Sequence, residues 1–126
     1  MEIYTFLLAN DNPACRQHLR RLVEAQPGWV VVAEAGDGAE AVRLAADCAP
    51  DVVLIDAMMP GMDGIEATWH IKTAAPQTRV IVLSGYPDEE FRRASLRAGA
   101  DHYLREEDLN AESLTQRIAT LFPQDH

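Results

Sequence analysis

The sequence has no long hydrophobic run, only two cysteines and few basic residues, and each of these shortages excludes a class of protein. No apolar stretch approaches the ~20 residues that a membrane-spanning helix needs. The N-terminus has no basic segment followed by an apolar one, so no secretion signal is expected. We therefore expect a cytoplasmic protein without membrane contact.

The two cysteines, Cys15 and Cys48, share no spacing that is typical of metal binding or redox chemistry. Lone thiols in a chain of this composition are usually small core residues, and we expect this of both. A disulfide between them is the less favoured alternative, on composition alone.

The charge is strongly negative, because the 126 residues include 20 acidic and 11 basic side chains and give a formal net charge of −9. Nucleic-acid affinity comes largely from Lys and Arg that neutralise phosphates, so this charge argues against direct nucleic-acid binding. Cationic, metal-containing or protein partners are expected instead. The length is that of one domain, and no linker or low-complexity tract divides it.

Five short apolar runs read as buried strands, and each is followed by a segment in which apolar residues recur at helical spacing. Asn12 and Pro13 predict the first helix start, since Asn caps free N–H groups and Pro fits the first helical position. Asp37 and Glu40 have the spacing of a capping box. The strands are predicted at residues 4–9, 29–33, 52–56, 79–83 and 101–105, the third and fourth helices at 63–74 and 88–98, and the last helix through 114–122.

Strands that alternate with helices predict a parallel sheet covered on both faces, with right-handed crossovers. The expected fold class is therefore α/β, a doubly wound (βα)5 sheet of the flavodoxin-like kind. In such folds the ligand site lies at the carboxyl ends of the strands.

The most informative stretch is residues 51–64, in which a buried strand ends in Asp56 and a loop rich in Pro and Gly follows. The first strand ends in Asn10 and Asp11, and the fourth ends near Ser84. Carboxylates and neutral oxygens at one edge suit Mg²⁺, and such a carboxylate can be the nucleophile of phosphoryl transfer. Alternatively, Asp56 and Asp11 cap helices and Ser84 shapes a turn; we favour the site.

Four segments resemble the receiver domain of the two-component response-regulator family, and together they extend the resemblance over essentially the whole chain. They are the helix start at residues 10–13, the strand and loop at 54–64, and the last two strands with their flanks at 82–86 and 98–104. The resemblance implies that residues 1–126 form a single receiver domain, with no output domain present.

By this resemblance Asp56 would be the phosphoacceptor, taking a phosphoryl group from a histidine kinase or phosphotransfer protein. Mg²⁺ would be held by Asp11, Asp56 and the backbone carbonyl of Met58, with Asn10 reaching it through water. The domain would be no enzyme beyond slow self-phosphorylation and self-dephosphorylation.

The resemblance also implies a switch, in which the hydroxyl of Ser84 is drawn toward the phosphoryl group and the ring of Tyr103 moves inward. The surface made by the fourth helix, fifth strand and fifth helix would then change, and a downstream protein, an effector domain or a second copy would bind there. A packed Tyr103 with its hydroxyl at the surface is an equally weighted alternative.

Two residues depart from the family pattern. Asn10 stands where a first Asp is usual, which removes one charge from the cation site. Glu106 stands where the family has a lysine that pairs with the phosphoryl group. Arg105 is no substitute, because successive side chains of a strand point to opposite faces and Arg105 shares the side of Tyr103.

These departures leave two functional hypotheses. We favour a phosphoacceptor receiver, and the alternative is a pseudo-receiver that acts as a phosphorylation-independent protein-interaction module. An enzyme that hydrolyses phosphate esters through Asp56 is much less favoured, since no general acid stands at a suitable offset.

Overall fold

The computed structural model describes residues 2–86 and 88–123, and it contains a five-stranded parallel sheet in the order β2-β1-β3-β4-β5. This confirms the predicted α/β, doubly wound fold. The elements are β1 (Tyr4–Ala9), α1 (Pro13–Glu24), β2 (Trp29–Ala35), α2 (Gly38–Cys48), β3 (Val52–Asp56), α3 (Gly64–Ala74), β4 (Arg79–Ser84), α4 (Glu89–Arg97), β5 (His102–Arg105), the short 3-10 helix η1 (Glu106–Asp108) and α5 (Ala111–Leu121).

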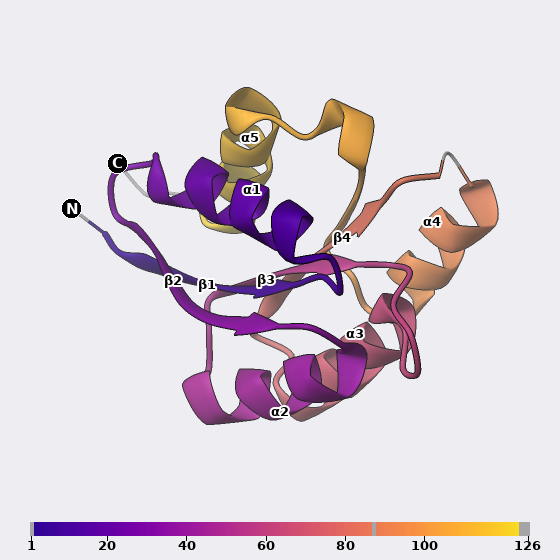
Figure 1. Cartoon of the computed structure of the whole chain (residues 1–126). Coiled ribbons are helices and arrows are strands. Elements are labelled where there is room, and N and C mark those ends of the chain that lie inside the picture. Colours follow the sequence, from indigo (N-terminus) through magenta and orange to yellow (C-terminus); the bar gives the residue numbers. More distant parts are fainter. Residues whose placement is uncertain (1, 87, 124–126) are drawn as a thin grey trace.

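The helices lie on both faces of the sheet, with α1 and α5 on one face and α2 and α3 on the other (Figure 1). α4 packs beside α3 and β5. The chain leaves β1 toward β2 on one side and returns to place β3 on the other, so the order reverses at the β1–β3 pair. The carboxyl ends of β1 and β3 therefore adjoin at the switch point, where open α/β folds place ligand sites. No helix in the described part of the chain has both the length and the apolar character to span a membrane.

The core has two layers, because alternate residues of each buried strand face opposite sides of the sheet. Phe6 and Leu8 of β1 pack toward Leu19 of α1 and Leu114 of α5. Leu7, between them, packs on the other side with alanines of α2 and α3. Small residues on that face let the two helices lie close to the sheet.

Helix starts follow the sequence signals closely. The side chain of Asn12 accepts hydrogen bonds from the backbone N–H groups of Ala14 and Cys15, which confirms the predicted cap with Pro13 at the first helical position. Asp37 caps α2 by accepting from the N–H of Glu40 at 2.7 Å. The capping box predicted there is wrong in its second bond, because the Glu40 carboxylate accepts from Gly36 instead of Asp37.

Two elements differ most from the predicted ones, while the ends of β4 and β5 shift by one residue. β2 extends two residues beyond the predicted end, because Glu34 and Ala35 still pair with the last residues of β1 after an irregularity near Val32. The short helix η1 was not predicted, since its sequence of three acidic residues has no apolar periodicity.

The expectation that both cysteines lie in the core is wrong, as both are exposed, free thiols. Cys15 falls on the buried stripe of α1 with Leu19 and Val23. At this first turn of the helix, however, Cys15 is exposed and borders a pocket of about 320 Å³. Cys48 is the last residue of α2 and lies beyond the buried Ala45.

Candidate functional site

A pocket of about 430 Å³ opens at the carboxyl edge of the sheet. Its walls come from the β1–α1 loop, the end of β3 with the loop that follows it, the β4–α4 loop and the start of η1. The residues with site chemistry that line it are Asn10, Asp11, Asp56, Met58 and Glu106. The fold thus brings together side chains that are up to 96 residues apart in sequence.

Asp56 ends the central strand β3, and its side chain is partly buried at the pocket floor. Its Oδ1 accepts a hydrogen bond of 3.2 Å from the backbone N–H of Met58. The pKa of Asp56 is raised from 3.8 to about 6, first by burial and then by the nearby carboxylates of Glu106 and Asp11, while the hydrogen bond from Met58 opposes the shift. Asp56 therefore accepts a hydrogen bond within the turn that follows β3, and it also lines the pocket.

The loop after Asp56 is held by close backbone approaches that only glycine permits. A Cβ on Gly64 would overlap the main-chain oxygen of Asp56, and one on Gly38 would overlap that of Met62. The N–H of Gly64 also donates to the carbonyl of Ala57 at 3.1 Å. These contacts press the start of α3 against the end of β3 and so define where Asp56 stands.

The β1–α1 loop supplies Asn10 and Asp11. Asn10 is buried, and its Oδ1 accepts a hydrogen bond of 2.9 Å from the N–H of Asn12. Asp11 is exposed at the pocket rim, and the capping oxygen of α1 belongs to Asn12. The cap alternative therefore does not describe Asp11, whose carboxylate is free to face the pocket that it lines.

Glu106 and its neighbour Arg105 point to different parts of the molecule. Glu106 opens η1 and lines the pocket, where a Cβ on Gly85 would lie 3.4 Å from its Oε2. Arg105 forms ion pairs with Glu107 and with Asp108, the latter at 3.3 Å. The structure thus places a negative group, and no arginine from β5, beside Asp56.

The chain has a single lysine, Lys72, and it lies on α3 away from this pocket. Its Nζ donates to Asp101 at 3.1 Å and to the carbonyls of Pro76 and Thr78. No lysine can therefore reach Asp56, so the charge reversal at Glu106 is not compensated by a lysine from elsewhere in the chain.

Ser84 and Tyr103 meet at one backbone carbonyl. Ser84 is buried at the end of β4; its Oγ donates to the carbonyl of Tyr86 at 3.0 Å and accepts from the Tyr86 N–H at 3.1 Å. The half-buried Tyr103 donates its hydroxyl to the same carbonyl at 3.2 Å. In this state Ser84 shapes a turn, and the Tyr86 carbonyl joins it to Tyr103.

Tyr103 also borders a second pocket of about 290 Å³ formed by α4, β5, η1 and α5. The pocket has charges of both signs, including Glu89, Arg92, Asp108 and Arg117. It lies on the surface where the resemblance places partner binding.

The donor set of the first pocket fits a hard divalent cation. Asp11 and Asp56 line it with carboxylates that could bind such an ion, Met58 lines it and has a main-chain carbonyl that could add a neutral oxygen, and Asn10 is a buried amide. Within residues 2–86 and 88–123, no three His, Cys, Asp or Glu side chains are grouped closely enough to hold a metal by themselves. A cation here would accordingly keep several waters, as Mg²⁺ does. The pairwise repulsion that raises the pKa of Asp56 would be relieved by it.

Four residues that line this pocket are not among the predicted site residues: Asn12, Cys15, Gly85 and Tyr86. Cys15 lines the pocket from the first turn of α1, and Tyr86 lines it from the β4–α4 loop. Cys15 was assigned to the core by its helical spacing, and Tyr86 had no signal apart from following Ser84 and Gly85.

Comparison with known proteins gives consistent matches. The family model described as the response regulator receiver domain matches residues 6–119. The Bacillus subtilis transcriptional regulatory protein YxjL is 40% identical over 105 residues, which are 83% of this chain and 48% of that protein. The regulatory protein LiaR of the same species is 44% identical over 98 residues, 78% of this chain and 46% of that protein. This chain spans about half the length of these curated relatives.

A solved structure agrees with them in sequence and in fold. It is a two-component response regulator of the LuxR family from Aurantimonas sp. SI85-9A1, with a TM-score of 0.87 and 37% identity. The match covers 94% of this chain and 85% of that one.

Proposed function

Since this chain belongs to the receiver-domain family of two-component response regulators, we propose that it accepts a phosphoryl group on Asp56 from a histidine kinase or phosphotransfer protein. The observation that carries the proposal is the Asp56 carboxylate at the end of β3, facing a pocket shared with Asp11 and Met58. A carboxylate oxygen attacks phosphorus, the bond from phosphorus to the donor nitrogen breaks, and an aspartyl phosphate forms. Water later returns the carboxylate and releases phosphate.

Asp11, Asp56 and the Met58 carbonyl would hold Mg²⁺, with Asn10 contributing through water. The ion supplies positive charge against the phosphoryl oxygens. Asp56 must be ionised to attack, and its raised pKa of about 6 means that the proton is mostly gone at neutral pH. Asn10 gives this chain one carboxylate fewer for the cation, so we expect weaker Mg²⁺ affinity than with Asp at that position.

The switch would run through Tyr86. When the Ser84 hydroxyl turns to a phosphoryl oxygen, the Tyr86 carbonyl loses one of its two donors. The loop and the Tyr103 ring then rearrange, which alters the α4–β5–α5 surface. A downstream protein, an effector domain or a second copy would dock there. Residues 1–126 would act as one receiver domain in the cytoplasm, without direct nucleic-acid contact.

The proposal is tested by incubating the chain with acetyl phosphate and Mg²⁺ and weighing the intact protein. We expect an adduct of about 80 Da, the mass of one phosphoryl group, that is absent from Asp56→Ala. Asp51→Ala is the matched control, since Asp51 precedes β3 at the opposite end of the strand, and it should keep the adduct. Failure of the wild-type chain to form any adduct over a range of Mg²⁺ concentrations would contradict the proposal.

The position of Glu106 favours a second candidate, a pseudo-receiver that binds its partner without phosphorylation. A carboxylate beside the phosphoryl group repels it, by ~1 kcal/mol when both are in water-like surroundings. If partner binding is unchanged in Asp56→Ala, this candidate replaces the first. The phosphoacceptor reading instead predicts that Glu106→Lys prolongs the life of the adduct, whereas Glu107→Lys, which makes the same charge change outside the pocket, does not.

A further inference from the structure

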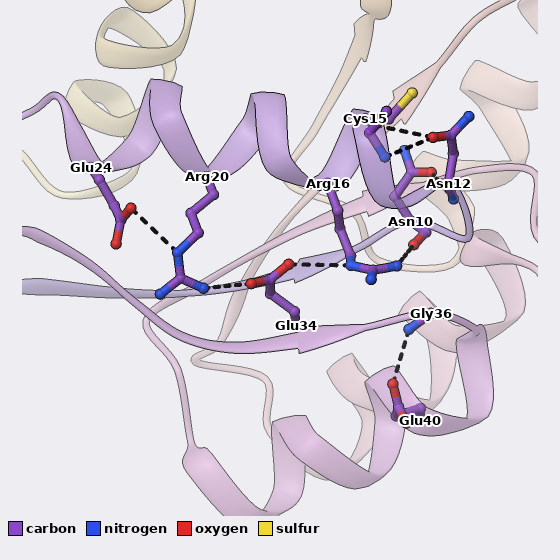
Figure 2. A network of polar contacts seen from close by, with 10 residues as sticks. Asn10, Asn12, Cys15, Arg16, Arg20, Glu24, Glu34, Gly36 and Glu40 are labelled. Carbon is purple, nitrogen blue, oxygen red and sulfur yellow. Dashed lines mark hydrogen bonds and ion pairs between the residues drawn. The ribbon is translucent and has the colours of Figure 1, made fainter.

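Arg16 on α1 contacts both β2 and the β1–α1 loop. It lies beside the pocket that Asp11, Asp56 and Glu106 line, called the acidic pocket below. It lies in the first turns of α1, and its side chain extends toward Glu34 on β2 and toward Asn10 at the end of β1 (Figure 2). Its Nε donates to Glu34 Oε1 at 3.2 Å, and its Nη1 donates to the main-chain carbonyl of Asn10 at 2.8 Å. The planar guanidinium can make both bonds at once because its donors point in fixed, divergent directions.

Asn10 is held in place by three hydrogen bonds, made by its N–H, its main-chain carbonyl and its side-chain oxygen. Its N–H donates to the carbonyl of Ala35 at 3.0 Å, its carbonyl accepts from Arg16, and its Oδ1 accepts from the Asn12 N–H. Ala35 follows Glu34 directly on β2, so the Ala35 bond and the Arg16–Glu34 ion pair both tie Asn10 to the end of this strand. Asp11 lies between the two anchored residues Asn10 and Asn12.

We propose that Arg16 is a positioning residue for the site: by tying Asn10 to Glu34 it holds the β1–α1 loop where Asp11 and Asn10 can serve the cation. Arg16 does not line the pocket, so it acts through the loop and not by touching a ligand. The inference rests on the proposed function only in that the site it serves is the Mg²⁺ and phosphoryl site.

Arg20 offers a comparison, because it shares the ion pair to Glu34 but not the hydrogen bond to the β1–α1 loop. It also pairs with Glu34, from the next turn of α1, and with Glu24 at 3.3 Å (Figure 2). It makes no bond to the β1–α1 loop. Replacing Arg16 removes the hydrogen-bond donor of the Asn10 carbonyl in a buried residue. Replacing Arg20 leaves the contacts of Arg16 with Glu34 and Asn10 in place.

The test compares Arg16→Met with Arg20→Met in the full chain. Amide hydrogen exchange at Asn10 and Asn12 reports the loop without any ligand, and calorimetry with Mg²⁺ reports the site. We expect Arg16→Met to raise exchange at these amides by about tenfold and to weaken Mg²⁺ binding by about fivefold. Arg20→Met should change each by less than about twofold, although it removes the same kind of ion pair.

Equal effects of the two variants, or no effect of Arg16→Met, would overturn the inference. Arg16→Lys provides a milder variant in case Arg16→Met does not fold. It keeps the charge but lacks the guanidinium fork, so it should give intermediate amide exchange and Mg²⁺ affinity. Wild-type values would refute the proposal that Arg16 must bond to Glu34 and Asn10 at once.

The outcomes separate this inference from the proposed function. If the wild-type chain binds Mg²⁺ but accepts no phosphoryl group, and Arg16→Met still loosens the loop and weakens the ion, the phosphoacceptor role fails and the role of Arg16 stands. If the wild-type chain is phosphorylated while both variants match it in exchange and affinity, the role of Arg16 fails alone.

Discussion

Asp56 is withdrawn from water at the end of β3 and faces two further carboxylates, so ionising it costs free energy. Its pKa of about 6 exceeds the unfolded value of 3.8. Between these two values the folded chain binds a proton that the unfolded chain has released. The stabilisation from that proton is therefore complete below about pH 4 and is lost as the pH rises through about 6.

We accordingly predict that Asp56→Asn raises the free energy of unfolding at about pH 7.5 by about 1–2 kcal/mol, a figure reduced to allow for water's access to the carboxylate. The gain should disappear by about pH 4, where the wild-type Asp56 is also neutral. Urea unfolding at both pH values measures it. Asp47→Asn, on the exposed side of α2, is the control and should change stability by less than ~0.5 kcal/mol at either pH; a similar gain there would show a general charge effect.

The sequence located Asp56 because a buried strand that ends in an acid before a Pro/Gly loop is a strong local pattern. It could also place Glu106 by gapless alignment, since strand alternation separates it from Arg105. Arg16 gave no such signal. Its partner Glu34 is brought near it by the pairing of β1 with β2, and one arginine on a helix otherwise reads as a solvated residue.

At the scale of elements, Gly64 lets the start of α3 pack closely against the end of β3, and the effect of replacing it can be predicted. Gly64→Ala places a methyl group into the main-chain oxygen of Asp56, which the backbone must move to accommodate. We expect a loss of about 3 kcal/mol in unfolding free energy and slower phosphorylation by acetyl phosphate, because Asp56 itself is displaced.

Gly36→Ala is the matched control for Gly64→Ala. A Cβ on Gly36 would lie 3.8 Å from Arg16 Nη1, which is an ordinary contact. This variant should cost less than ~1 kcal/mol and leave phosphorylation unchanged. A Gly64→Ala chain as stable and as reactive as the Gly36→Ala chain would contradict the proposed strand–helix fit.

The strands and helices were predictable because their apolar runs and caps are local. The wrong predictions concern features that depend on contacts between residues far apart in the sequence. β2 lengthens because Glu34 and Ala35 pair with residues of β1. Glu40 accepts from Gly36 at the entry to α2, where Gly38 packs against the main-chain oxygen of Met62. η1 has three acids and no periodicity, so no pattern could reveal it.

At the scale of the whole molecule, the Tyr86 carbonyl connects the acidic pocket to the α4–β5–α5 surface, since it accepts from both Ser84 and Tyr103. If this is the route of the switch, removing the Ser84 hydroxyl should separate phosphorylation from its distant effect. Ser84→Ala should still form the adduct with acetyl phosphate and Mg²⁺, because Asp56 and the cation ligands are intact.

The distant effect is measured by the backbone amide chemical shifts of His102, Leu104 and their neighbours in β5 during phosphorylation. We expect Ser84→Ala to lose most of the change seen in the wild-type chain and Tyr103→Phe to lose roughly half, since one of the two donors remains in each case but only Ser84 can turn to the phosphoryl group. Tyr4→Phe makes the same chemical change at the opposite end of the sheet and should keep the full response. Full responses in Ser84→Ala and Tyr103→Phe would place the coupling outside the Tyr86 carbonyl, because neither donor would then be needed to carry the change from Asp56 to β5.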